Sequence, residues 1–418
     1  MTVSVDRSRP DPAPSVSTAS RSLLQRPLWI LSGQLGIVLS VFIGFGARAG
    51  FKPKLTLAML SCCVVGMVGL GPPRGVNRIV VTLPVVAASG WWMASYLWTF
   101  NVFGWWTDTQ LFMPFVVVAV VFVGMLPADD FRAALVAGCY IAIAYTLVEI
   151  AVHPGAATVN PDGVVGWRGG FIHKNSMGPF MVFAVLVLMT FDRPSLRRRA
   201  AVIVAVGLII ASQSTTALAA GVVTLFVAVL LHRLARGTRP ARASLVAGAL
   251  CTAVLGGVLA SNVFPAVLGI SGKDPTLTGR TDIWRGVWSA IERRPWQGYG
   301  VGGVWRDPSV DPARSILRGL GFTVFHSHNG FLEVMLVLGA IGLGLFVWLL
   351  VSTVRLGLTN LRTDTPGAVC AVGLVVVIVM VSISEVAVFG IWLGLISAFQ
   401  CALTRTDAHR RGLPSITG

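Results

Sequence analysis

The motifs GRTDIW (279–284) and HSHNG (326–330) lie in the one long polar stretch, 271–333, of a chain that is otherwise strongly apolar. A shorter polar motif, RGGFIHKN, lies upstream at 168–175. We expect most of the chain's reaction chemistry to lie in these two segments. We therefore expect the apolar remainder to be a scaffold that holds the two segments together.

The composition is that of a membrane protein. Of 418 residues, 55% are hydrophobic and only 12% are charged, with a mean hydropathy of +0.77. Soluble domains carry roughly 25% charged residues. A net charge of +16 can indicate nucleic-acid binding, but most Lys and Arg residues sit in short segments between apolar runs. We expect no nucleic-acid partner and an all-α, polytopic membrane protein.

Twelve apolar runs are candidate transmembrane helices, which need about 17–25 residues to cross a hydrocarbon core of ~30 Å. We predict a large extracytoplasmic loop, about 264–328, between the ninth and tenth helices, and a membrane domain over 27–404. Residues 1–26 and 405–418 are predicted to be cytoplasmic tails, the first of them disordered. The twelve runs lie near 28–47, 55–71, 79–98, 110–126, 133–152, 176–191, 199–212, 215–232, 244–263, 329–353, 368–384 and 388–404.

The distribution of Lys and Arg predicts the orientation. With the N-terminus in the cytoplasm, the inside segments hold 20 of these residues and the short outer loops hold 5. Cytoplasmic loops are the ones enriched in Lys and Arg. Both termini are thus predicted inside, and both motifs outside. Glu149, Glu333 and Glu385 then share the outer boundary and suggest one polar pocket, although each could simply be solvated at the interface.

Residues 281–293 predict a helix along the membrane surface, because apolar side chains recur at helical spacing. Thr281 or Thr278 could cap it. Arg280 then lies at a helix N-terminus, where free backbone N–H groups already favour an anion. A guanidinium there is a plausible phosphate clamp; alternatively, Arg280 pairs with Asp282 or with lipid headgroups. The apolar positions are Ile283, Trp284, Val287, Trp288 and Ile291.

Four of the six histidines are expected outside the membrane. A neutral histidine is the usual group for taking a proton from a hydroxyl near neutral pH, but a single histidine is more often structural, and spacing does not choose among the four. Arg168 and Lys174 add positive charge beside one of them. The four histidines are His153, His173, His326 and His328.

The arrangement resembles the O-antigen ligase and polymerase superfamily over residues 28–404. The shared features are twelve predicted spans, a large outer loop between the ninth and tenth, and an outer motif before the sixth. The most specific parts are 279–284 with 295–300, and His328-Asn329 followed by Gly339 and Gly342. The Arg168…His173-Lys174-Asn175 stretch is most similar to the exopolysaccharide-polymerase branch.

The resemblance implies metal-independent, inverting glycosyl transfer at the outer face of a bacterial cytoplasmic membrane, without a cofactor. The donor would be a glycan on polyprenyl diphosphate. Arg280 and Arg168 match the arginines expected to bind the diphosphate, and His328 matches the general base. His326 would orient His328 or contact the acceptor, as a third catalytic residue, and the His-Ser-His form leaves open which of the two histidines is the base. The remaining residues expected to bind substrate or to shape its site are His173, Lys174, Asn175 and Asn329.

Ligase and polymerase stay open at this point, because the acceptor could be another glycan, a lipid or a protein hydroxyl. Membrane lipids are further expected partners. A rival hypothesis is a transporter or flippase of lipid-linked glycans, which predicts polar or broken segments near the membrane midplane. A third is a non-catalytic assembly partner, which would tolerate loss of both His326 and His328.

Overall fold

The computed structural model describes residues 81–160, 165–237, 279–318, 320 and 324–410. The predicted runs 28–47, 55–71 and 244–263 lie outside the described residues, as do the tail 1–26 and much of the tail 405–418. Within the described ranges the protein is built of helices, with one isolated bridge between Val159 and Val165 and no strand. The predicted all-α class is confirmed for this part of the chain.

Six described helices are long and apolar enough to cross a membrane: α5 (Ala128–Val152), α7 (Lys174–Phe191), α9 (Thr215–Arg236), α13 (Gly330–Thr359), α14 (Thr365–Ser382) and, over Val102–Val121, α4 (Val102–Met125). The predicted count of twelve is therefore not confirmed. The other described helices are α3 (Leu83–Ala94), the 3-10 turn η2 (Ser95–Leu97), α6 (Pro154–Thr158), α8 (Leu196–Ala211), α11 (Arg280–Arg293), α12 (Ala313–Leu317) and α15 (Ile391–Arg410).

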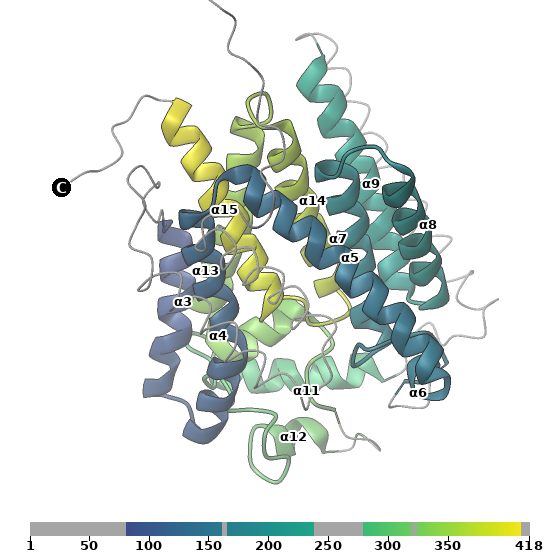
Figure 1. The fold of residues 1–418 in the computed structure, drawn as a ribbon. Helices are drawn as coiled ribbons and strands as arrows, with labels where there is room; N and C mark the ends of the chain where they lie inside the picture. The colour runs from purple at the N-terminus through teal and green to yellow at the C-terminus, as the bar shows by residue number, and fades with distance from the viewer. Residues whose placement is uncertain (1–80, 161–164, 238–278, 319, 321–323, 411–418) are drawn as a thin grey trace, which may run out of the picture.

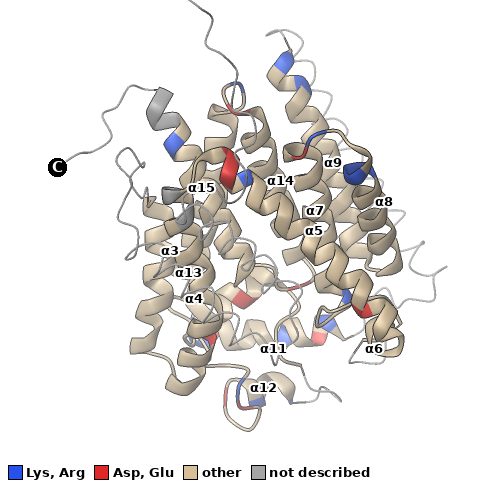
Figure 2. Ribbon diagram, in the orientation of Figure 1, with Lys and Arg blue, Asp and Glu red and all other residues tan. Residues whose placement is uncertain are grey.

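The long helices form two groups that lie side by side (Figure 1). One group contains α3, α4, α13 and α15, and the other contains α5, α7, α8 and α9. Helix α14 packs against α7 and α9 on one side and against α13 and α15 on the other, so it joins the groups. The short helices α6, α11 and α12 lie together at one end (Figure 1). Charged residues concentrate at the two ends and leave a mostly uncharged middle (Figure 2), as a membrane-spanning body requires.

Helix α13 is interrupted in its first third at Gly339, whose backbone has φ 69° and ψ −174°. A side chain there would collide with the carbonyl oxygen of Trp296. The segment 295–300 docks into the interruption, which satisfies backbone groups that the broken helix leaves open. The amides of Tyr299 and Gly300 donate to the carbonyls of Leu336 and Val337, and those of Ala340 and Ile341 donate to the carbonyls of Pro295 and Trp296, at 2.8–3.2 Å.

This docking explains why the two glycine-containing segments 295–300 and 339–342 both stood out in the sequence. It also fixes the long polar stretch against a membrane helix immediately after α11. The N-termini of α7, α11 and α13 and the C-terminus of α14 consequently meet at the end that carries the short helices, through the hydrogen bonds described next.

Candidate functional site

Glu385, in the link between α14 and α15, joins the two sequence motifs. Its Oε1 atom accepts hydrogen bonds from Arg280 Nη2 at 2.9 Å and from Asn175 Nδ2 at 2.7 Å. Its Oε2 atom lies 3.4 Å from Nδ1 of His328, an ion-pair contact longer than a well-formed hydrogen bond. Arg280 and Asn175, which lie 105 and 210 positions before Glu385 in the sequence, therefore share one carboxylate.

Arg280 reaches Glu385 because α11 begins at this residue. Gly279 precedes the helix with φ 77°, a left-handed conformation that favours glycine. The helix expected at 281–293 is present and starts one residue earlier, after Gly279, so Thr281 does not cap it; Thr278, the other candidate, lies outside the described residues. Asp282 pairs with Arg285 at 2.8 Å, and this leaves Arg280 to the Glu385 carboxylate.

The apolar face of α11 is buried as its pattern predicts, and it holds the helix beside the second motif. Trp284 packs against the core, and its indole N–H donates to the carbonyl of Ser327 at 2.9 Å. Trp288, on the predicted apolar face, is instead half exposed. The buried side chains of α11 are Ile283, Val287, Ala290 and Ile291.

Residues 326–329, called the histidine loop below, are fixed at both ends. Asn329 caps α13: its Oδ1 accepts from the amides of Phe331 and Leu332, and its Nδ2 donates to the Ile383 carbonyl at 3.1 Å. The buried carboxylate of Glu333 accepts from the Ser327 amide and from the indole N–H of Trp305, both at 2.8 Å. The loop is thus tied to α14 and to the base of α13.

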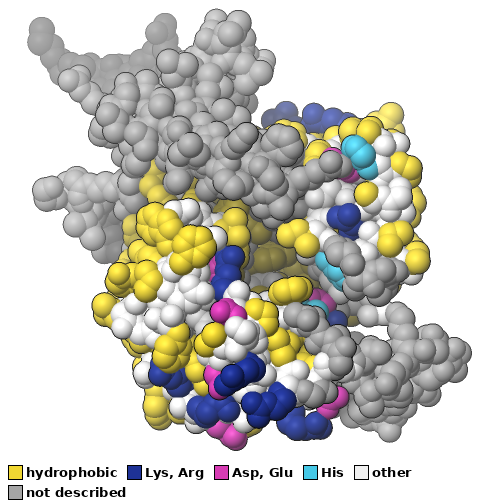
Figure 3. Space-filling model, turned by 90° about the horizontal axis from the view of Figure 1, so that it is seen from below, with side chains coloured by type: hydrophobic (Ala, Val, Ile, Leu, Met, Phe, Trp, Pro, Cys, Tyr) yellow, Lys and Arg dark blue, Asp and Glu magenta, His cyan; other side chains and the backbone are white. Residues whose placement is uncertain are grey.

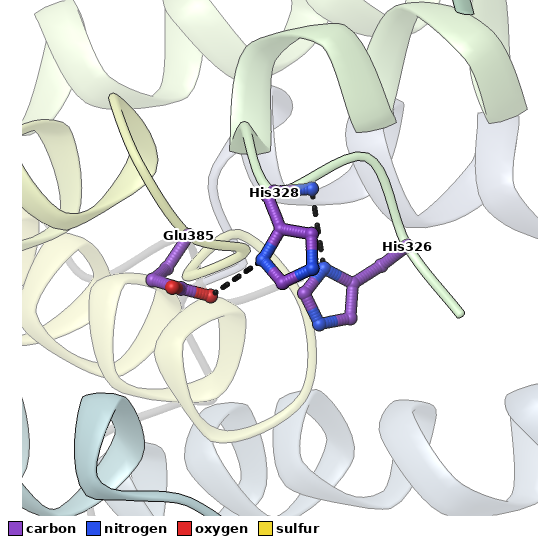
Figure 4. Close-up of side chains that lie close together, drawn as sticks. All are labelled: His326, His328 and Glu385. Carbon is purple, nitrogen blue, oxygen red and sulfur yellow. Dashed lines mark hydrogen bonds and ion pairs between the residues drawn. The ribbon is translucent and has the colours of Figure 1, made fainter. Parts of the chain in front are cut away.

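The two histidine rings, which lie next to each other (Figure 4), carry their hydrogen on different ring nitrogens. His328 has φ 52°, rare for a non-glycine residue, and its amide donates to Nδ1 of His326 at 3.2 Å. Burial, reinforced by the charge of His328, lowers the pKa of His326 to about 4. His326 is therefore neutral near pH 7, and since its Nδ1 accepts, its hydrogen sits on Nε2.

His328 has the opposite arrangement. Its Nδ1 faces the carboxylate of Glu385 (Figure 4), which favours a hydrogen on Nδ1 and leaves Nε2 as the acceptor. Burial raises the pKa of Glu385, but the close contact with His328 and the charges of His328 and Arg280 outweigh this and hold the pKa below its usual range. Glu385 is then a carboxylate able to stabilise a protonated His328.

The upstream loop (165–175) reaches this cluster through Asn175. His173 caps α7 by accepting the Asn175 amide at 3.2 Å, and its charge contributes to lowering the pKa of His326. Lys174 Nζ donates to the carbonyl of Val165 at 3.2 Å. Arg168 donates through Nε to the carbonyl of Val159 at 2.9 Å and through Nη1 to that of Phe171 at 2.8 Å. The substrate-binding roles expected for Arg168, His173 and Lys174 stay predictions.

The three glutamates expected at one level have separate partners. Glu385 and Glu333 support the histidine loop from two sides, whereas Glu149 contacts His153 at 3.4 Å. Glu385 was expected at the outer boundary, in a polar pocket, but not among the catalytic or substrate-binding residues. The signal that could have found it is the polar pair at 384–385, which separates two long apolar runs.

Three of these groups could in principle hold a metal ion. One ligand atom each from His326, His328 and Glu385 lies within 4.8 Å of the others. However, Oε1 of Glu385 already accepts from a guanidinium and an amide, and Nδ1 of His326 accepts a backbone amide. The donor set is thus largely engaged within the protein, and metal independence stays a prediction.

The end of the molecule that carries α11 and α12 is hollowed. Seen from that side, basic, acidic and histidine side chains surround a depression between two parts of the described surface (Figure 3). A depression with charged and histidine side chains suits a polar substrate that approaches from one end of the helices.

Comparison with known proteins shows what this chain is similar to. Residues 200–347 match the family described as O-antigen ligase, a range that contains Arg280 and the histidine loop. The chain is also 28% identical over 292 residues to the exopolysaccharide production protein ExoQ of Rhizobium meliloti (strain 1021), across 62% of this chain and 64% of that protein. The resemblance to the O-antigen ligase and polymerase superfamily is confirmed.

Proposed function

We propose that this relative of the O-antigen ligases and exopolysaccharide polymerases transfers a glycan from a polyprenyl-diphosphate carrier to a hydroxyl acceptor. The observation that carries the proposal is the meeting of Arg280, Asn175 and His328 on the carboxylate of Glu385. A histidine oriented by a carboxylate is the arrangement of a general base. A guanidinium beside it can stabilise a phosphate leaving group.

In this mechanism Nε2 of His328 takes the proton of the acceptor hydroxyl as its oxygen attacks the anomeric carbon of the donor sugar. The bond between that carbon and the diphosphate oxygen breaks, and the diphosphate leaves with the electron pair. Attack opposite the leaving group inverts the anomeric configuration. Glu385 stabilises the positive charge that forms on His328, and no metal ion takes part.

The leaving diphosphate would bind where the N-termini of α7, α11 and α13 converge. The dipoles of the three helices favour an anion at such a point. Arg280 stands at the first position of α11, and Asn175 lies in the first turn of α7. Arg168, His173 and Lys174 in the upstream loop and Asn329 at the cap of α13 complete the proposed substrate contacts. Polymerase and ligase share this chemistry and differ in the acceptor.

The site is proposed to face outward from a bacterial cytoplasmic membrane, with both termini inside. Arginines gather at the opposite end of the helices, in the link between α7 and α8 and at the end of α9, and Lys and Arg mark the cytoplasmic side. Membrane lipids surround the spans, and the lipid-linked donor reaches the site from the outer leaflet.

The transporter hypothesis receives one supporting feature, the break in α13 at Gly339. Transporters place such breaks at a polar substrate site. Here, by contrast, the break is filled by backbone hydrogen bonds from 295–300, and the polar cluster lies at the helix ends. The arrangement favours transfer over transport.

The test is turnover in lipid nanodiscs with a polyprenyl-diphosphate oligosaccharide, with products separated by gel and identified by mass spectrometry. We expect a ladder of repeat units for a polymerase, or one block added to a separate acceptor for a ligase. Arg280→Ala and His328→Ala should each lower the rate by ~100-fold or more.

Matched controls are Arg285→Ala, on the same helix but paired with Asp282, and His153→Ala, outside the Glu385 cluster. Both should retain nearly full turnover. Movement of the lipid-linked glycan between leaflets without transfer would instead establish the transporter hypothesis. Full transfer by a protein lacking both His326 and His328 would show that neither histidine is the base.

A further inference from the structure

A cavity of about 430 Å³ opens beside His326, within the ~300–1,000 Å³ typical of ligand sites. It lies between α3, α4, the segment 301–306, the first turns of α13 and the link that follows Glu385. Its walls are mainly aromatic and aliphatic, and the aromatic side chains are Trp92, Phe112, Trp305, Phe325 and Phe389.

The cavity also has charged groups, which separate it from a hydrocarbon-binding pocket. Asp108 of α4 pairs with Arg306, and both line the cavity with Glu333 and His326. A second, smaller pocket next to it shares Trp92 and Phe389 but is lined by apolar residues throughout. A lipid chain would bind only to an entirely apolar wall such as that of the smaller pocket. A sugar ring has apolar C–H faces and hydroxyls at its edge, so it suits the larger cavity, whose walls combine aromatic and charged side chains.

Two aromatic rings of the cavity are placed for stacking. The indole N–H of Trp305 donates to Glu333 at 2.8 Å, which fixes the orientation of its ring. Phe325, next to His326 in sequence, is 70% exposed, so core packing does not account for it. An exposed aromatic ring beside a partly buried ion pair is a suitable surface for one face of a sugar, with charged groups left for its hydroxyls.

The position of the cavity decides which substrate it receives. His326, whose ring centroid lies 4.1 Å from that of His328, lines the cavity, whereas Arg280, on the proposed diphosphate side, does not. Donor and acceptor must approach the base from different sides. We propose that this cavity binds a sugar ring of the acceptor glycan, between Phe325 and Trp305 and against the Asp108–Arg306 pair. This proposal rests on the proposed glycan transfer.

Two measurements with the full-length protein in nanodiscs test it. The probe is a set of free oligosaccharides released from the surface polysaccharide of the source bacterium. Binding is measured by calorimetry, and turnover at saturating lipid-linked donor gives the KM for the same oligosaccharide as acceptor. We expect Arg306→Gln and Phe325→Ala each to raise the Kd and the KM for the oligosaccharide by about tenfold or more. The KM for the donor should be unchanged.

The controls are Arg314→Gln, which removes an arginine from another ion pair in the same stretch, and Phe103→Ala, which removes an equally exposed phenylalanine. Neither lines the cavity. Unchanged Kd and KM in Arg306→Gln and Phe325→Ala, with wild-type turnover intact, would overturn the acceptor site but leave the transferase standing. Oligosaccharide binding that depends on the two residues without any turnover would support a sugar site and reject the transferase.

Discussion

The upstream loop (165–175) and the stretch that carries Arg280 and the histidine loop contain the same residue types and differ in how these are used. In the upstream loop, Arg168 and Lys174 donate to backbone carbonyls, and His173 caps α7. In the downstream stretch, Asn329 and Glu333 hold the backbone, and Arg280 and His328 are directed at Glu385. The difference shows that side chains of the same type can form a site only where other side chains make the hydrogen bonds that hold the backbone in place.

The largest effect is expected from removing the group that the two loops share. Glu385→Gln should lower kcat/KM by ~100-fold or more, because Arg280 and His328 lose their anionic partner in a partly buried site. The reaction is followed at saturating donor, with the melting temperature of each variant measured alongside.

Glu149→Gln is the matched control, because Glu149 contacts a histidine at the same 3.4 Å but in a different place. It should leave kcat/KM within a few-fold of wild type. A Glu385→Gln protein that works equally well would show that the two loops act independently.

A smaller difference should separate the two arginines. Arg280→Ala is expected to lower kcat by ~100-fold, as loss of a group that stabilises developing charge does. Arg168→Ala should act mainly on the KM for the donor, by about tenfold, with a lower melting temperature because two hydrogen bonds to its own loop are lost. Equal losses of kcat in both variants would assign both arginines to the leaving group.

Acid pH should distinguish the two loops through stability. The pKa of His326 lies at about 4 in the folded protein, below its ordinary value of 6.5. Between pH 6.5 and 4 the unfolded chain binds a proton that the folded chain does not, so stability falls as the pH drops across this window. The loss attributable to His326 is on the order of 3 kcal/mol at most.

His326→Gln should flatten this part of the pH profile of the melting temperature, and Arg168→Gln, in the upstream loop, should leave it in place. Protonation of Glu385, whose folded pKa is lowered from 4.5, adds a further loss at still lower pH. An unaltered profile in His326→Gln would place the titrating group elsewhere.

The smallest expected effect is none. Removal of metal ions with EDTA should leave turnover unchanged, because the potential ligands His326, His328 and Glu385 are joined to protein groups from both loops. Activity that disappears with EDTA and returns with one divalent cation would mean that a metal, and not the protein alone, joins the loops.

The sequence predicted the positions of the helices better than the contacts between residues that are distant in the chain. Apolar period and length located α5, α7, α9, α13 and α14 within a few residues, and the spacing of Ile283, Val287 and Ile291 located α11. Those signals are local. Glu385 escaped assignment because its partners are distant in sequence and meet it only after packing. The kink at Gly339 likewise depends on backbone bonds to 295–300, which no periodicity records.

The docking of 295–300 on the broken helix α13 limits how the site can open. Four backbone hydrogen bonds hold the segment to a membrane helix, and each unpaired polar group away from water costs several kcal/mol. This part of the polar stretch cannot swing away from α13 as a lid. Its amide protons, at Tyr299 and Gly300, should exchange with deuterium as slowly as those inside α13, and any gate for the substrate must be formed by other segments.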